Sequence, residues 1–264
     1  VAEDHTISVT FKLKTYTITA SAGENGSITP SGPTSVTHGG SQTFTFTPDA
    51  GYEVSEIRVD GSTQPVSDSY TFTNVTASHT ISVTFALKTY TITASAGEHG
   101  TINPSGSTTV NHGSSQTFTF TPAEGYEVSG FTVDGAPQPA ADSYTFNNVT
   151  GDHTISVTFA LKTYTITASA GAGGSITPTG EVVVNHGSSR TFTFTPATGY
   201  EVSGILVDGN PEPVADSYTF NNVTTDHTIS VSFVLKTYTI DASAGQHGSI
   251  DPEGLIPVTH GSNQ

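Results

Sequence analysis

Residues 151–171 read GDHTISVTFALKTYTITASAG, and this stretch decides the fold of the chain. It contains two runs of alternating apolar and polar residues, 153–159 and 163–169, with only three residues between them. Such alternation predicts β-strands with one buried face. The apolar positions are odd-numbered in the first run and even-numbered in the second, so one regular strand cannot turn both runs toward one core. The stretch therefore predicts a junction between two β-domains.

The strand pattern recurs every 74 residues. The phrase KTYTI begins at Lys14, Lys88, Lys162 and Lys236, and no insertion or deletion disturbs this spacing. A fixed period of this length indicates tandem domains, each the size of a small β-domain. Because the chain starts within a repeat and lacks an initiator Met, we expect a piece of a longer polypeptide. It then comprises the end of a preceding repeat, repeats 1, 2 and 3, and the start of a further repeat, at residues 1–14, 15–88, 89–162, 163–236 and 237–264.

The residue pattern of each repeat predicts about seven short strands and no helix. Gly and Pro interrupt the chain too often for a long helix to form. Short strands at this spacing are typical of a β-sandwich. We therefore expect an all-β tandem array of small, immunoglobulin-like β-sandwich repeats that forms an elongated rod. In repeat 2 the expected strands are 89–95, 101–103, 108–111, 116–121, 126–133, 143–147 and 153–159.

One strand of each repeat changes the parity of its apolar residues. In repeat 2 Val128 and Phe131 cannot both face the core of a regular strand. An extra residue would restore the alternation, so a β-bulge is predicted between them. The three predicted bulges lie at Ser55-Glu56, Ser129-Gly130 and Ser203-Gly204.

Composition excludes several classes of protein. The chain has no Cys, so it can form no disulfide, zinc ribbon or thiol nucleophile. Lys and Arg number 7 against 23 Asp and Glu, which gives a formal net charge of −16. Such a chain repels phosphate backbones and anionic lipids, so we expect no nucleic-acid partner. No apolar run is long enough to cross a bilayer, so we expect no membrane insertion in this segment.

Asp152-His153 contains two ingredients of a hydrolase triad. The pair recurs as Asp4-His5 and Asp226-His227 but becomes Ser78-His79 in repeat 1, and no Gly-x-Ser-x-Gly motif occurs. The histidines form no closely spaced pair typical of a metal site. We therefore predict no catalytic residue, no cofactor and no metal ligand.

Asp-Gly pairs place further carboxylates in loops, at Asp60-Gly61, Asp134-Gly135 and Asp208-Gly209. No EF-hand spacing accompanies them, so turn formation explains them better than calcium binding does. In repeat 2 prolines follow at 137 and 139, so we expect a loop after Asp134 rather than a tight hairpin.

The junctions between repeats carry one regular Lys each. If the strands alternate strictly in direction, His112 lies where the chain leaves its repeat, and His227 where it enters the next one. We then expect His38 and His153 to face the junction between repeats 1 and 2, which contains Lys88. His112 and His227 are expected to face the junction between repeats 2 and 3, which contains Lys162. Because these lysines are expected at exposed junctions, a buried Lys–Asn isopeptide crosslink is disfavoured. Candidate glycosylation sites are the Asn-Val-Thr sequons at Asn74, Asn148 and Asn222.

The order SAG..GSI.P.G, TFTFTP, GYEV..I.VDG and SYTF.NVT.DHTI.VTF resembles the divergent internalin B-type repeat of bacterial and archaeal surface proteins. The resemblance covers the three whole repeats and both partial ones. It implies an extracellular, cell-surface location, an adhesin-like protein and no catalytic residues. It also implies a β-grasp-like fold with a helix as the alternative to the β-sandwich, although the chain lacks Trp and any helical pattern.

These features predict a non-enzymatic structural region, either a stiff stalk of a surface adhesin or a fibre-forming subunit. Its expected partners are the neighbouring repeats, other copies in a fibre, or a host or matrix surface. The alternative is a module that binds a glycan or a cation through several repeats at once.

Overall fold

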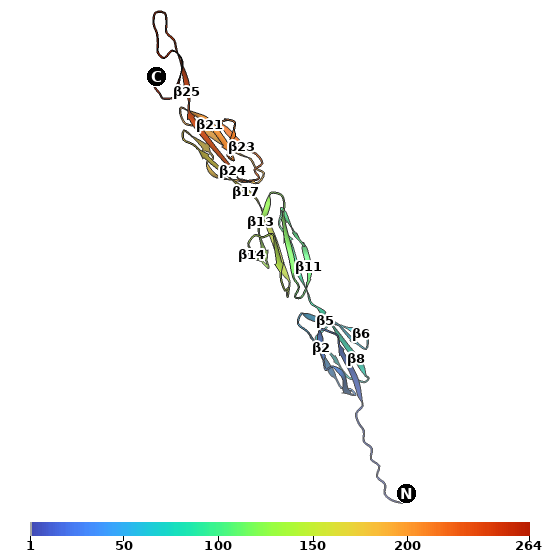
Figure 1. The fold of residues 1–264 in the computed structure, drawn as a ribbon. Coiled ribbons are helices and arrows are strands. Elements are labelled where there is room, and N and C mark those ends of the chain that lie inside the picture. Colours follow the sequence, from blue (N-terminus) through green and yellow to red (C-terminus); the bar gives the residue numbers. More distant parts are fainter. Residues whose placement is uncertain (1) are drawn as a thin grey trace. The chain divides into compact units, whose positions relative to one another are not determined.

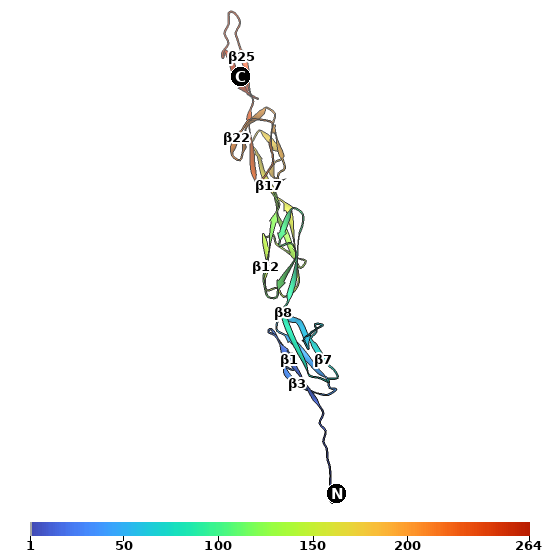
Figure 2. The ribbon, with the colours of Figure 1, turned by 90° about the vertical axis from the view of Figure 1, so that its right-hand side faces the viewer.

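The computed structural model describes residues 2–264, which form strands and turns but no helix (Figures 1 and 2). Each of the three repeats contains one five-stranded and one three-stranded sheet. In repeat 1 a single core joins side chains from both sheets, such as Ile18 and Ile81 from one and Phe44 and Phe72 from the other. The predicted all-β tandem array of β-sandwiches is therefore confirmed. The helix of the alternative β-grasp fold does not form in residues 2–264.

Each repeat has eight strands, one more than predicted. Repeat 1 contains β1 (Thr15–Ala22), β2 (Gly26–Thr29), β3 (Gly32–Thr37), β4 (Gln42–Pro48), β5 (Tyr52–Val59), β6 (Ser62–Gln64), β7 (Ser69–Phe72) and β8 (His79–Leu87). Repeat 2 contains β9 (Thr89–Ala96), β10 (Gly100–Asn103), β11 (Gly106–Asn111), β12 (Gln116–Pro122), β13 (Tyr126–Val133), β14 (Ala136–Gln138), β15 (Ser143–Phe146) and β16 (His153–Leu161). Repeat 3 contains β17 (Thr163–Ala170), β18 (Gly174–Thr177), β19 (Gly180–Asn185), β20 (Arg190–Pro196), β21 (Tyr200–Val207), β22 (Asn210–Glu212), β23 (Ser217–Phe220) and β24 (His227–Leu235). The last residues form the hairpin of β25 (Thr237–Ala242) and β26 (Gly254–Thr259).

The first and last strands of each repeat run parallel to each other. The five-stranded sheet of repeat 1 has the order β3-β1-β8-β5-β6, and β1 pairs with β8 in parallel, with Ile18 opposite His79. The three-stranded sheet has the order β2-β4-β7, and repeats 2 and 3 have the same orders. Strict alternation would make β1 and β3 parallel, but they pair antiparallel, with Ile18 opposite Thr34, so that assumption is wrong.

This topology corrects the predicted position of His112. Asn111, at the end of β11, lies opposite Thr89, the first residue of β9. The His112 N–H donates to the carbonyl of Lys88 at 2.9 Å. His112 thus lies where the chain enters repeat 2, not where it leaves it. The reason for placing His112 with His227 at one seam no longer holds.

The Asp-Gly pair after β13 closes a tight hairpin, contrary to the prediction of a loop. Val133 lies opposite Ala136, so Asp134 and Gly135 are the two turn residues, with φ of 50° and 78°. Positive φ at both central residues is the geometry of a type I′ hairpin turn. Pro137 is tolerated because β14 is an edge strand, where a missing N–H breaks no inner ladder.

The predicted bulges are present in repeats 1 and 3, where the pairing register shifts between Val54 and Glu56 and between Val202 and Gly204. In repeat 2 Phe131 is buried, as the parity change required. Ser129 Oγ lies 2.9 Å from Thr158 Oγ1, so a hydroxyl pair joins β13 to β16.

Aromatic and branched aliphatic side chains fill the cores. The most deeply buried aromatic residues are Phe44, Phe118 and Phe192, one in each repeat at the same position. Burying a Phe side chain contributes about 1.5–3 kcal/mol. No polar or charged side chain is buried in residues 2–264, so the hydroxyls and carboxylates lie at the surface.

Candidate functional site

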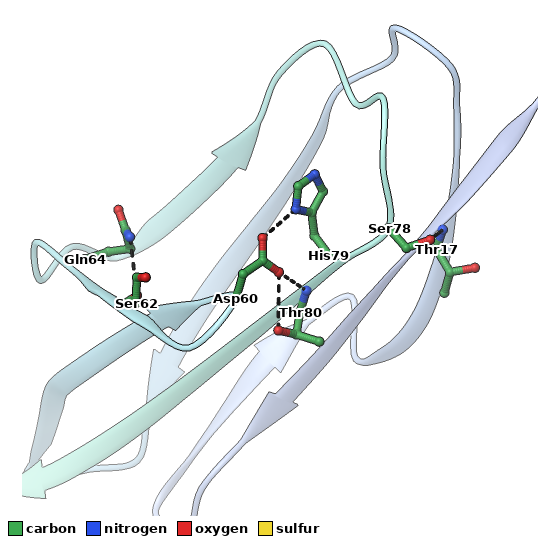
Figure 3. Close-up of polar contacts among 7 residues, drawn as sticks. All are labelled: Thr17, Asp60, Ser62, Gln64, Ser78, His79 and Thr80. Atoms are coloured by element: carbon green, nitrogen blue, oxygen red, sulfur yellow. Dashed lines mark hydrogen bonds and ion pairs between the residues drawn. The ribbon is translucent and has the colours of Figure 1, made fainter.

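A carboxylate, an imidazole and a threonine meet at one end of each sandwich (Figure 3). In repeat 1 the β5–β6 turn places Asp60 beside His79, the first residue of β8. His79 Nδ1 lies 2.7 Å from Asp60 Oδ2, and the Thr80 N–H donates to Asp60 Oδ1 at 2.8 Å. Repeats 2 and 3 reproduce the contact at 2.7 Å, between His153 and Asp134 and between His227 and Asp208. We call these three groups the Asp–His clusters.

The cluster geometry favours an ionised carboxylate. Hydrogen bonds from His79 and from the Thr80 N–H lower the pKa of Asp60. The Thr154 N–H lowers the pKa of Asp134, with a further contribution from His153. Burial works against ionisation of Asp208, but the bonds from Thr228 and His227 outweigh it, so the pKa of Asp208 is also lowered. The aspartates of the three clusters therefore remain ionised at a lower pH than a free aspartate does.

The residue before each histidine binds the backbone of the first strand. Asp152 Oδ1 accepts the Thr91 N–H at 2.7 Å, and Ser78 Oγ accepts the Thr17 N–H at 3.2 Å in repeat 1. Figure 3 shows Ser78 directed at Thr17 and away from the Asp60 carboxylate. Aspartate and serine thus perform the same structural task here, which explains their exchange between repeats.

The structure brings together two motifs that the sequence left apart, Asp-Gly and Asp-His. In repeat 2 they border a shallow depression lined by Thr91, Thr93, Asp134, Asp152, His153 and Thr154. Sequence reasoning missed this pairing because β5-type and β8-type strands become neighbours only in the folded sheet. In residues 2–264 no three His, Asp or Glu side chains converge as metal ligands.

Among the described contacts, only repeat 3 has a hydroxyl group near Nε2 of the cluster histidine. Thr225 Oγ1 lies 3.4 Å from His227 Nε2, a distance too long for a strong O–H···N bond. The equivalent residues are Ala77 and Gly151, which carry no hydroxyl. The cluster that all three repeats share is therefore an Asp–His pair anchored to backbone, rather than a nucleophile with its base.

A different histidine lies at each junction. Lys162 is the only residue between β16 and β17, and its carbonyl accepts the His186 N–H at 2.9 Å. The His186 ring lies against Gly125, where an added Cβ would come within 2.4 Å of it. His153 and His227 bind aspartates, and each lies opposite the fourth residue of the first strand of its repeat, so their place at the junctions stays a prediction. Lys88 has the same position with His112 and Gly51, and Lys14 accepts the N–H of His38.

The three sequon asparagines lie exposed in turns. Asn74, Asn148 and Asn222 have φ of 51°, 50° and 52°, and each precedes a valine that is buried in the core. Val75 fixes the turn, because its N–H donates to Gly40 and its carbonyl accepts from Gly39, both at 2.9 Å. The exposed side chains suit modification, and glycosylation at these positions stays a prediction.

Comparison with solved structures finds several distant likenesses. One is "The Bacillus anthracis TIE protein", at 10% identity and a TM-score of 0.34, with 83% of this chain and 51% of that chain covered. This chain therefore spans about half the length of that protein. Another is the I9-I11 tandem of titin, at 8% identity and a TM-score of 0.14, with 84% and 97% covered. No curated protein matches the chain significantly.

A family comparison is more informative, because it matches the repeat itself. The matching description is "Divergent InlB B-repeat domain", and three consecutive matches cover residues 16–89, 90–163 and 164–237. These matches follow the same period as the sheets and the Asp–His clusters. The chain therefore belongs to the divergent InlB B-repeat domain family.

Proposed function

We propose that this chain is a non-enzymatic structural region at the cell surface, where its tandem repeats act as a stiff stalk of an adhesin or as part of a fibre. InlB-type repeats are typical of bacterial surface proteins, which supports this location. The Asp–His clusters support a structural role, since the aspartate oxygens accept bonds that tie the β5–β6 turn to β8.

The observation that carries the proposal is the bonding of the linker residue. Lys88 alone separates β8 from β9, and its N–H donates to the Gly51 carbonyl of repeat 1 at 2.8 Å. Its carbonyl accepts the His112 N–H of repeat 2 at 2.9 Å. Both backbone groups of the linker are thus engaged, one with each repeat. A linker held in this way resists bending, whereas a Gly/Ser-rich linker behaves as a flexible coil.

The second junction has the same bonds. The Lys162 N–H donates to Gly125 and its carbonyl accepts from His186, both at 2.9 Å. A spacer requires a restraint at every junction, because bending at any one junction shortens the end-to-end length of the array.

Small-angle X-ray scattering of the chain tests the stalk. A short Gly-Ser insertion between Leu87 and Lys88 should break the bonds of that linker and shorten the mean maximum dimension. The same insertion in the loop between β6 and β7 adds equal length away from the junction and should leave the dimension unchanged. Identical scattering from the two variants would mean that the junction does not restrain the repeats. Labelling of intact cells by an antibody against this chain tests the surface location.

A further inference from the structure

The first and last strands of each repeat lie side by side and run in the same direction. In repeat 1, β1 and β8 pair in parallel from Ile18 opposite His79 to Ala22 opposite Val83. Strands β9 and β16 pair in the same way in repeat 2, and β17 and β24 in repeat 3. Because the chain enters each repeat through the first strand and leaves it through the last, these two strands receive any tension that acts along the chain.

The paired stretch lies between the points where the chain enters and leaves the repeat. Thr15, the first residue of β1, precedes the first paired residue, Ile18, by three positions. Leu87, the last residue of β8, follows the last paired residue, Val83, by four positions. Tension on the two ends therefore pulls β1 and β8 in opposite directions along their own axes. The evenly spaced hydrogen bonds of a parallel ladder connect one strand to the other, so this shear loads them together.

Further bonds close both ends of the ladder. In repeat 3 the Gly171 N–H donates to the Val231 carbonyl at 2.8 Å, just past the last paired residue of β17. At the opposite end Asp226 Oδ1 accepts the Thr165 N–H at 2.8 Å. Repeat 1 has the equivalent bonds at both ends. Sliding of the first strand along the last must break these bonds as well as the ladder between them.

Buried side chains support the same pair of strands. Ile18 and Ala20 of β1 and Ile81 and Val83 of β8 are at most 5% exposed and belong to one core. Sliding of the strands would move these side chains out of register in a closely packed interior. The apolar core also keeps water from one face of the ladder, which strengthens its hydrogen bonds.

Both strands are also held from outside the pair. The sheet order β3-β1-β8-β5-β6 places β3 beside β1 and β5 beside β8, so neither of the two is an edge strand. The Asp–His cluster fastens the start of β8, where Asp60 binds His79 and Thr80 through its side chain. The Asp60 N–H also donates to the Thr80 carbonyl at 3.0 Å. Pulling β8 out of the sheet from its far end must therefore also break the cluster.

We propose that the parallel pair of first and last strands is a load-bearing clamp, which keeps each repeat folded while the chain is under tension. This inference rests on the proposed stalk, since a stalk transmits force between its two ends. Forced unfolding is governed by the unfolding rate rather than by the equilibrium free energy. A small repeat without disulfides can therefore bear load when its end strands must slide past each other before any other part unfolds.

The direction of pull tests the clamp without changing the fold. The chain has no Cys, so two introduced cysteines provide the only attachment points for single-molecule stretching. T15C/A86C pulls β1 and β8 along their axes, whereas T15C/A77C has its second attachment just before β8 and separates the two strands from one end. The first variant should unfold repeat 1 at a mean force about twofold higher or more, because its bonds must break together.

Stability is controlled within the same pair of variants. All three attachment positions are exposed, so the two variants should have equal urea midpoints. A difference in force then reflects the direction of pull alone. Equal forces in the two directions, or a lower force for T15C/A86C, would overturn the proposal.

A second experiment removes one end of the ladder in every repeat. S78A/D152A/D226A deletes the side-chain acceptors of the first strand, and T43V/T117V/T191V deletes one hydroxyl of each threonine pair on the three-stranded sheet, outside the clamp. Both are stretched at constant force through cysteines in E3C/N263C. The acceptor variant should unfold about two- to tenfold faster, the rate equivalent of one hydrogen bond. Equal acceleration in the two variants would contradict the clamp.

Stretching and scattering report separate properties of the chain. Free bending at the junctions in scattering contradicts the stiff stalk, and a higher force for T15C/A86C in that case still supports the clamp. Conversely, a stiff chain whose repeat 1 unfolds at the same force in both directions of pull retains the stalk and overturns the clamp.

Discussion

Nδ1 of His153 lies 2.7 Å from Oδ2 of Asp134, and this contact fastens the β13–β14 turn to the start of β16. The two residues are 19 positions apart, Asp134 in the turn after β13 and His153 at the start of β16. The same contact occurs in each repeat, between the turn after the fifth strand and the start of the last strand. We therefore expect the Asp–His clusters to contribute to the free energy of unfolding.

The clusters should make the stability of the chain depend on pH in the acid range. The pKa of Asp134 is lowered in the folded state, by the Thr154 N–H first and by His153 in addition. A carboxyl group of this kind stabilises the fold fully above its unfolded pKa, about 3.9, and loses that effect as the pH falls through the lower folded pKa. Urea midpoints should therefore decline below about pH 4. The triple variant D60N/D134N/D208N should show a flatter acid limb, and an unchanged limb would show that the clusters do not contribute.

Aspartate and serine should be interchangeable at the residue before each histidine. Asp152 accepts the Thr91 N–H, and Ser78 accepts the equivalent N–H of Thr17. Asp152→Ser should leave the melting temperature close to that of the wild type. Asp152→Ala removes the acceptor and should cost about 0.5–1.5 kcal/mol, the usual contribution of one hydrogen bond. Equal losses in the two variants would mean that the charge of Asp152 matters rather than its bond.

The bulge should be detectable through Phe131. Its side chain is 6% exposed, while Phe118 in the middle of the core is fully buried. Phe131→Ala and Phe118→Ala should each cost about 3–5 kcal/mol in urea unfolding of the chain. Val183→Ala, at a side chain that is 67% exposed, is the control and should change the stability by less than about 0.5 kcal/mol. A cost near zero for Phe131→Ala would argue for a regular strand.

The junction histidine should respond to a methyl group at one glycine and not at another. Gly125 and Gly135 both have φ of +78°, so alanine pays the same backbone cost of about 1–2 kcal/mol at each. Only at Gly125 would the new Cβ meet the His186 ring, because nothing lies within 4 Å at Gly135. Gly125→Ala should therefore shift the NMR signals of the His186 imidazole and lower the melting temperature further than Gly135→Ala does. Unchanged His186 signals would show that the ring does not rest on Gly125.

Local pattern alone predicted much of this molecule. The 74-residue period, the all-β class and the buried faces follow from alternation and spacing, which neighbouring residues determine. The bulges could also be predicted, since burying both Val128 and Phe131 requires an extra residue whatever the strand pairs with. The prolines at 137 and 139 predict a loop after Asp134, but an edge strand tolerates proline, so the tight turn at Asp134-Gly135 forms instead.

Tertiary structure decided the pairing of distant strands and therefore the site. Parallel β1 and β8 strands, and the antiparallel β5 strand beside β8, follow from the path of the chain between two sheets. That path brings Asp134 to His153, and it places His186 rather than His227 beside Lys162. Alternation along a strand specifies which of its residues are buried, but it does not specify which strand pairs with it. The same residues would face the core beside any neighbouring strand. The sequence by itself thus determined the repeats and their cores, and the fold alone determined which polar side chains meet.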